Sequence, residues 1–247
     1  MALKDNTKTL IVDVMDAYVY KGDDLIFYSE NLTSTSIKNE VKQSEVNNGK
    51  GNSLFSVLNQ GKSAKITLSS NVFSFATVAL NTGLEIVTGA GVAYKNPEIM
   101  TLGATKEITL TNAPIIEGEL AFLKLDGTPI EGVYESTGKT VTFATGVTGD
   151  KVKVMPYRYE SPATSTTITV DADTFATGCR LVLKTYEKGA DQTILSDIDI
   201  ICENVMPLGS WELNTKSEVQ AEDANIELNV MIDSEGNYYK IVKTPRV

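Results

Sequence analysis

The feature that most constrains this chain is a hydrophobic period of two residues. Apolar or β-branched side chains occupy every second position in many short runs, and turn residues separate the runs. Such alternation gives a strand one dry face and one wet face. Five runs show it: Lys65-Ile-Thr-Leu-Ser, Glu107-Ile-Thr-Leu-Thr, Thr166-Thr-Ile-Thr-Val-Asp, Arg180-Leu-Val-Leu-Lys-Thr-Tyr and Asn225-Ile-Glu-Leu-Asn-Val-Met-Ile-Asp. Many short strands with frequent turns predict a mainly β fold, a sandwich or a barrel.

One segment has helical spacing instead. Ser70 or Asn71 is a suitable N-cap, and Gly83 can adopt the left-handed conformation that ends a helix. Between them, apolar residues recur at intervals of three and four: Val72, Phe73, Ala76, Ala79 and Leu80. This pattern predicts one short amphipathic α-helix packed against the sheet.

The segment 37–63, before this helix, is polar. It contains Ser44-Glu-Val-Asn-Asn-Gly-Lys-Gly-Asn-Ser53, and its glycines, asparagines and serines favour an irregular, mobile loop. A loop this long inside a compact domain is usually functional. We therefore take its centre as a candidate functional segment: Asn47, Asn48, Gly49, Lys50, Gly51 and Asn52.

The segment 107–162 predicts a small unit of its own. It holds several strand-like runs, with Pro114 and Pro162 near its ends, and about 50 residues suffice for a small Ig-like sandwich. We therefore predict a discontinuous main domain, 1–106 plus 163–247, with an inserted Ig-like β subdomain at 107–162.

The chain has 247 residues and no histidine. This excludes His-based acid–base catalysis, the Ser–His–Asp and Cys–His nucleophiles, and nearly every zinc or copper site. The pairs Asp171/Asp173 and Asp197/Asp199 place two carboxylates on one strand face, but no calcium-binding loop surrounds them. Acid–base use of such a pair, as in glycosidases, is not excluded by residue type. We expect no catalytic residue, no metal and no cofactor.

Cys179 and Cys202 lie in strand-like runs, without a Cys-x-x-Cys spacing, and predict buried, reduced thiols. Trp211, the single tryptophan, shares a strand face with Leu213 and predicts a core position. Near the N-terminus, Asp13 interrupts a three-residue apolar run, and no stretch approaches the roughly 20 apolar residues of a membrane span. We expect no membrane insertion and folding in a cytoplasm.

The charge is acidic and unevenly distributed. Lys plus Arg number 22 and Asp plus Glu 32, a net charge of −10, which argues against clamping nucleic acid through its phosphates. Between Ala190 and Glu235 the sequence has many carboxylates and one base, Lys216. This stretch is either a solvated sheet face or a negative surface that repels nucleic acid or meets a basic partner.

The order of these features resembles a known family. Gly49-Lys-Gly-Asn-Ser-Leu-Phe-Ser-Val-Leu precedes the strand-like Lys65-Ile-Thr-Leu-Ser and the helical segment ending at Gly83. This order is similar to the pattern "G-x-G-N-x-L-hydrophobic, strand, short helix ending in Gly" of major tail (tube) proteins of long-tailed bacteriophages. Gly149-Asp-Lys-Val-Lys-Val-Met-Pro-Tyr-Arg-Tyr resembles Ig-like elements of phage virion proteins, and Tyr238-Tyr-Lys-Ile-Val resembles part of the closing hairpin of the tube family.

The resemblance implies a phage tail-tube-like β-sandwich or barrel with one short flanking α-helix and a small Ig-like β insert. It implies a structural virion subunit without catalytic residues, assembled in the host cytoplasm into stacked, usually hexameric rings that form the hollow conduit for genomic DNA. The implied partners are further copies of the chain, the tape measure, the tail terminator and the baseplate or tip, while DNA passes without specific binding. The resemblance also implies that the candidate residues from Asn47 to Asn52 lie at contacts between subunits or rings.

A polyanion slides most easily past a wall that offers no cations. We therefore predict that some residues of the acidic stretch line the lumen, with these candidates: Asp197, Asp199, Glu212, Glu218 and Glu227. Two alternatives stay open. One is another virion component, such as a capsid-decorating or head–tail joining protein, and the other is a β-sandwich binding module or adhesin.

Overall fold

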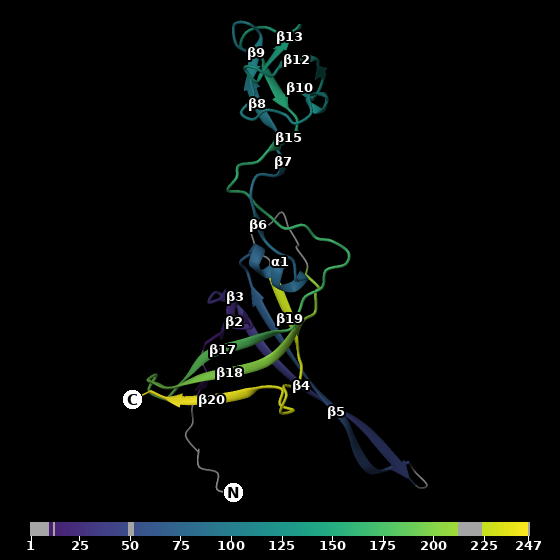
Figure 1. Ribbon diagram of the computed structural model, residues 1–247, viewed down its shortest axis with the longest axis vertical. Coiled ribbons are helices and arrows are strands. Elements are labelled where there is room, and N and C mark those ends of the chain that lie inside the picture. The colour runs from purple at the N-terminus through teal and green to yellow at the C-terminus, as the bar shows by residue number, and fades with distance from the viewer. Residues whose placement is uncertain (1–9, 12, 49–51, 212–223, 247) are drawn as a thin grey trace. The chain divides into compact units, whose positions relative to one another are not determined.

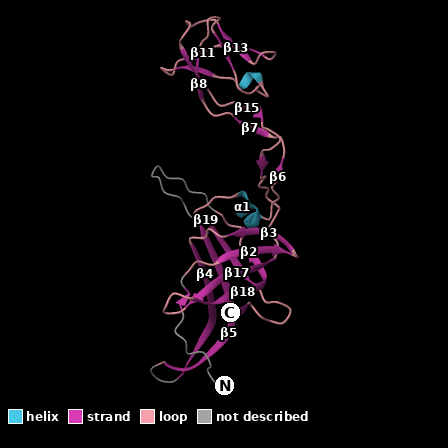
Figure 2. Cartoon of the chain, turned by 90° about the vertical axis from the view of Figure 1, so that its left-hand side faces the viewer, coloured by secondary structure: helices cyan, strands magenta, loops and turns pink. Residues whose placement is uncertain are grey.

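The computed structural model describes residues 10–11, 13–48, 52–211 and 224–246, which belong to two compact units. The first unit takes its residues from 1–86 and 168–247, and the second spans 87–167. Strands dominate both units, so the predicted mainly β fold is confirmed (Figure 2). The predicted insert boundaries, 107 and 162, lie inside the second unit.

The first unit contains one antiparallel sheet (Figure 1). Its described strands are β1 (Leu10–Ile11), β2 (Asp16–Lys21), β3 (Asp24–Ser29), β4 (Ser34–Asn48), β5 (Ser53–Ser70), β17 (Cys179–Lys188), β18 (Ile194–Pro207), β19 (Ala224–Val230) and β20 (Lys240–Pro245). They follow the order β3-β2-β17-β18-β19-β5-β4, with β1 paired to β17 and β20 paired to β18. Segments far apart in the sequence therefore become neighbours.

One face of this sheet forms the core of the first unit. Leu181 lies opposite Cys202 and Leu183 opposite Ile200 across the β17–β18 pair, and all four are buried. Cys179 is buried on the same strand, and both cysteines are free thiols, as predicted. The alternate residues of these strands lie on the wet face, as the period of two predicts.

The helix α1 (Phe75–Thr82) packs on this core through Leu80. Gly83 ends it in the left-handed conformation, with φ 77°, as predicted. The predicted N-cap is wrong: Ser74 caps the helix, and its hydroxyl accepts a hydrogen bond from the Thr77 amide at 3.1 Å. Phe73, one of the residues at helical spacing, lies before the cap and contacts Phe75 edge to face.

The strand expected from Thr166 onward is mostly absent. Only β16 (Thr166–Thr167) forms there. The Asp171 carboxylate accepts hydrogen bonds from the amides of Asp173 and Thr174, which closes a turn where the alternation predicts a strand. Asp171 and Asp173 therefore do not form a pair on one strand face.

The second unit is built from short strands. In chain order they are β6 (Val87–Thr88), β7 (Val92–Tyr94), β8 (Glu98–Thr101), β9 (Glu107–Thr109), β10 (Phe122–Lys124), β11 (Pro129–Ile130), β12 (Gly132–Glu135), β13 (Thr140–Phe143), β14 (Lys151–Val154), β15 (Arg158–Glu160) and β16. One 3-10 turn, η1 (Glu117–Glu119), precedes β10.

These strands make small antiparallel sheets in the orders β11-β10-β14-β8 and β12-β13-β9, with the two-stranded ribbons β7–β15 and β6–β16. The first two sheets enclose one core, in which Phe122 and Phe143 meet edge to face at 5.1 Å between ring centres. Gly132 allows this packing, because a Cβ there would come within 2.5 Å of the Val141 side chain. The second unit therefore has a core of its own.

Candidate assembly surface

The polar segment predicted as an irregular loop is a β-hairpin. Residues 34–48 and 53–70 form β4 and β5, which pair from Ser34↔Ser69 out to Asn48↔Ser53. Both views show this hairpin running out beyond the other strands of the first unit (Figure 1, Figure 2). The prediction of irregular structure is wrong because backbone donors and acceptors, not side chains, make the ladder, and polar side chains do not prevent it.

The outer part of the hairpin has no further strand beside it among the described residues. The last pair between β5 and β19 is Ala64↔Val230, and β4 is the edge of the sheet. We call residues 42–48 and 52–61 the arm. Within the part of the chain that the structure describes, its two edges therefore present unpaired backbone groups, the usual template for pairing with another chain.

The arm also exposes apolar side chains on both faces. Leu54 and Val57 lie opposite Asn47 and Glu45 on one face, while Leu58 lies on the other. Leu54 is 57% exposed, Phe55 73% and Leu58 56%. An isolated two-stranded hairpin is marginally stable in water, and clustered exposed apolar groups mark interaction sites. The arm has the composition of a surface that a partner covers.

The predicted loop contacts lie at the end of this arm. Asn47 and Asn48 end β4, and the side chain of Asn47 is exposed. Asn52 precedes β5 with a positive φ of 52°, a conformation that asparagine tolerates better than most residues. Gly49, Lys50 and Gly51 lie outside the described residues.

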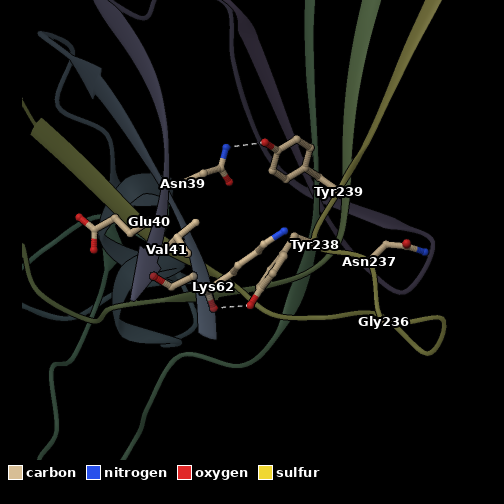
Figure 3. Close-up of a pocket in the computed structure, with 9 residues that line it drawn as sticks. Asn39, Glu40, Val41, Lys62, Gly236, Asn237, Tyr238 and Tyr239 are labelled. Atoms are coloured by element: carbon tan, nitrogen blue, oxygen red, sulfur yellow. Dashed lines mark hydrogen bonds between the residues drawn. The ribbon is translucent and has the colours of Figure 1, made fainter. Parts of the chain in front are cut away.

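A pocket of about 450 Å³ lies at the base of the arm (Figure 3). Tyr238 and Tyr239, from the connection between β19 and β20, face residues of β4 and β5 across it. The Tyr238 hydroxyl donates to the Lys62 carbonyl at 2.5 Å, and the Asn39 amide nitrogen donates to the Tyr239 hydroxyl at 2.6 Å. The two hydrogen bonds across the pocket thus connect the C-terminal segment to both strands of the hairpin.

The turn that presents these tyrosines is held by Asp233. Its carboxylate accepts from the amides of Glu235 and Asn237 at 2.9 and 2.8 Å. The backbone hydrogen bond from Asn237 is the main reason that the pKa of Asp233 lies below its ordinary value. The ionised carboxylate therefore stabilises the turn.

The predicted lumen carboxylates that the structure describes are paired with cations. Asp199 contacts Lys184 at 2.8 Å, Asp197 contacts Arg246 at 2.6 Å, and Glu227 contacts Lys65 at 2.7 Å. The hydrogen bond from Arg246 lowers the pKa of Asp197. Glu212 and Glu218 lie outside the described residues.

These cations come from other strands or from the chain end, not from the acidic stretch itself. Asp197 and Asp199 share the wet face of β18, and Lys184 is the cross-strand neighbour of Asp199 on β17. Asp197, Asp199 and Glu227 are therefore neutralised by cations that lie outside the acidic stretch. These paired cations are not free to bind a polyanion.

The described residues contain no group of three or more potential metal-ligating side chains. Burial raises the pKa of the Cys179 thiol to about 11 and that of Cys202 to about 12, so both thiols stay protonated and unreactive near neutral pH. In the described part of the chain, no helix has the length and hydrophobicity required to cross a membrane.

Two features of the structure were not foreseen. Trp211 is 40% exposed, so the predicted core position is wrong. Tyr238 and Tyr239 gave no sequence signal beyond the resemblance, because their partners Lys62 and Asn39 are about 180–200 residues away in the chain. Only the strand order brings these groups together.

The family model described as "YomU/Tube protein family" matches residues 9–241 of this chain. This range covers almost the whole sequence and both compact units. The search of curated proteins finds no match.

Proposed function

Since this chain belongs to the YomU/Tube protein family, we propose that it is the major tail tube subunit of a long-tailed bacteriophage. In this role it is a structural virion protein without catalytic activity. Copies assemble in the host cytoplasm into hexameric rings, and the rings stack into the hollow conduit through which phage DNA passes. The tape measure, the tail terminator and the baseplate or tip complete the tail.

The arm is the observation that carries this proposal. It exposes apolar side chains on two faces and unpaired backbone groups on two edges. A subunit that polymerises head to tail needs such a surface. In a heterologous contact two different surfaces meet, so each added copy still presents one of them to the next copy. The arm of one copy docks on a copy in the next ring, with Asn47 to Asn52 at the contact.

The wet face of the main sheet forms the wall of the conduit in this proposal. Asp197, Asp199 and Glu227 lie on it together with the cations that neutralise them. DNA then passes without specific binding, because the paired cations are not free to hold phosphates. A structure of the polymer in which these carboxylates all lie on the outside rejects this part of the proposal.

The experiment is to concentrate the purified full chain and examine it by sedimentation and negative stain. The expected product is rings or long hollow filaments. In the matched variant, residues 43–60 are replaced by Asn-Gly, which joins the directly opposed Lys42 and Gly61 by a two-residue turn. This variant is expected to stay folded and to form no filaments.

Other outcomes favour the two alternatives. Small oligomers that bind capsids indicate a decoration or head–tail joining protein, and monomers with glycan affinity indicate an adhesin. Filaments from the arm-less variant reject the arm as the stacking contact.

A further inference from the structure

Two hydrogen bonds hold the hairpin where the arm begins, and we call this pair of bonds the grip. Tyr238 bonds the carbonyl of Lys62 on β5, and Tyr239 accepts from Asn39 on β4. One residue further out, the pairing Lys42↔Gly61 is followed by a β-bulge. The grip therefore holds β5 one residue before this last regular pair, and β4 three residues before it.

Tyr238 supplies a donor that the sheet itself lacks. The pairing of β5 with β19 ends at Ala64, two residues before Lys62, so β19 offers no amide to the Lys62 carbonyl. The Tyr238 hydroxyl donates to this carbonyl instead. It extends the support of β5 beyond the end of its neighbouring strand.

The segment that carries the tyrosines is itself anchored. Asp233 closes its turn, and the Asn204 side chain on β18 donates to the Ile232 carbonyl at 3.2 Å. Tyr238 and Tyr239 are also half-buried against the core of the first unit. The grip is thus a connection between the arm and the body of the sheet.

We propose that Tyr238 and Tyr239 are positioning residues that fix the direction of the arm before it docks on another copy. This inference rests on the proposed tube function. A hairpin with two open edges bends freely, and ordering it on docking reduces affinity. The grip orders the base of the arm before docking, so that less affinity is lost when the arm docks. The docking contact itself remains on the arm.

The first test is hydrogen exchange on the full-length subunit below its polymerisation threshold. The variants are Tyr238→Phe and Asn39→Leu, each of which removes one hydrogen bond and retains a side chain of similar size. Tyr94→Phe, at an exposed tyrosine of the second unit, is the control. We expect arm amides 42–48 and 52–61 to exchange several-fold faster in the two variants, with amides 64–68 unchanged.

The second test is the critical concentration for assembly. It is expected to rise roughly fivefold for each hydrogen bond removed, the factor that one such bond supplies. Asn39→Asp is the rescue variant, because its carboxylate can accept from the Tyr239 hydroxyl and restore the link. Its critical concentration is expected near that of the parent chain.

Unchanged arm exchange overturns the inference, and so does faster exchange throughout the first unit, which means a general structural role. If the parent chain never assembles, the proposed function fails, while the exchange of the arm still decides whether the tyrosines position it. Equal critical concentrations for Asn39→Leu and Asn39→Asp also overturn the inference.

Discussion

The β4–β5 hairpin is one ladder in two environments. At its base, Ile66 and Leu68 are completely buried between β4 and β19, with α1 packed on the same core. In the arm, Leu54 and Leu58 are more than half exposed. The same two strands and the same residue type therefore contribute to the fold at one end and remain available for a partner at the other. Burial follows from neighbouring strands, not from the alternation itself.

The largest expected effect is on the base. Leu68→Ala should lower the free energy of unfolding of the first unit by about 2–5 kcal/mol, because it leaves a cavity in a closed core. Urea unfolding followed by circular dichroism measures it. Leu58→Ala, the matched change in the arm, should alter the free energy by less than about 0.5 kcal/mol. Similar losses for the two variants would remove the distinction between base and arm.

The second prediction concerns the arm alone. Replacing Leu54 and Leu58 by serine removes apolar surface from both of its faces. The double change should raise the critical concentration for assembly at least tenfold, which is about 1.4 kcal/mol in the free energy of adding one subunit. The unfolding of the monomer should stay unchanged. Val133→Ser, at a side chain of the second unit that is 76% exposed, is the control and should assemble normally. Normal assembly of the double variant would mean that the arm is not a docking surface.

The third prediction concerns the helix α1, which packs on the core at the base of the hairpin. Ser74→Ala removes the N-cap of α1 and should destabilise the first unit by about 1 kcal/mol, because the Thr77 amide loses its acceptor. Arm exchange should not change. Asn71→Ala, at the exposed position that the sequence offered as a cap, should have almost no effect. A larger effect at Asn71 than at Ser74 would contradict the observed helix start.

The smallest expected effect is a loss of folding stability at acidic pH. The pKa values of Asp197 and Asp233 are lowered, by Arg246 and by the Asn237 amide respectively, so each stabilises the fold above the ordinary aspartate pKa of about 4. This stabilisation is lost as the pH falls through the lowered values. Asp16 acts in the opposite sense, because burial raises its pKa. Urea midpoints measured from pH 6 to pH 2 should fall, and less steeply for Asp233→Asn, whose amide oxygen still accepts but does not titrate. An equally steep fall in that variant would mean that Asp233 contributes nothing.

The sequence predicted elements whose signals are local. The predicted run Arg180-Leu-Val-Leu-Lys-Thr-Tyr lies within the strand β17, because its alternating residues match the pleat of a strand. Gly83 ends α1 as predicted, because few other residues adopt the left-handed conformation without strain. The start of α1 was missed by several residues, since Val72 and Phe73 continue the apolar spacing outside the helix.

The candidate surface was only partly predictable. The polar composition around Asn47 predicted an irregular loop, which is wrong, because each strand of the hairpin pairs with the other. The carboxylates of the acidic stretch were counted correctly. The pairing of Glu227 with Lys65 and of Asp199 with Lys184 was not predictable, because these cations lie on β5 and β17. Whether Asn47, Asp197 and the other candidates act in assembly stays a prediction.

The sequence by itself determined which side chains can share a face, where turns form and where the helix stops, because these depend on backbone geometry over two to four residues. Tertiary structure alone decided which faces are covered, which carboxylates meet a cation, and that Tyr238 reaches the arm. Those outcomes depend on the order of strands in the sheet. That order is set by the packing of the whole unit, and no short window of residues contains it.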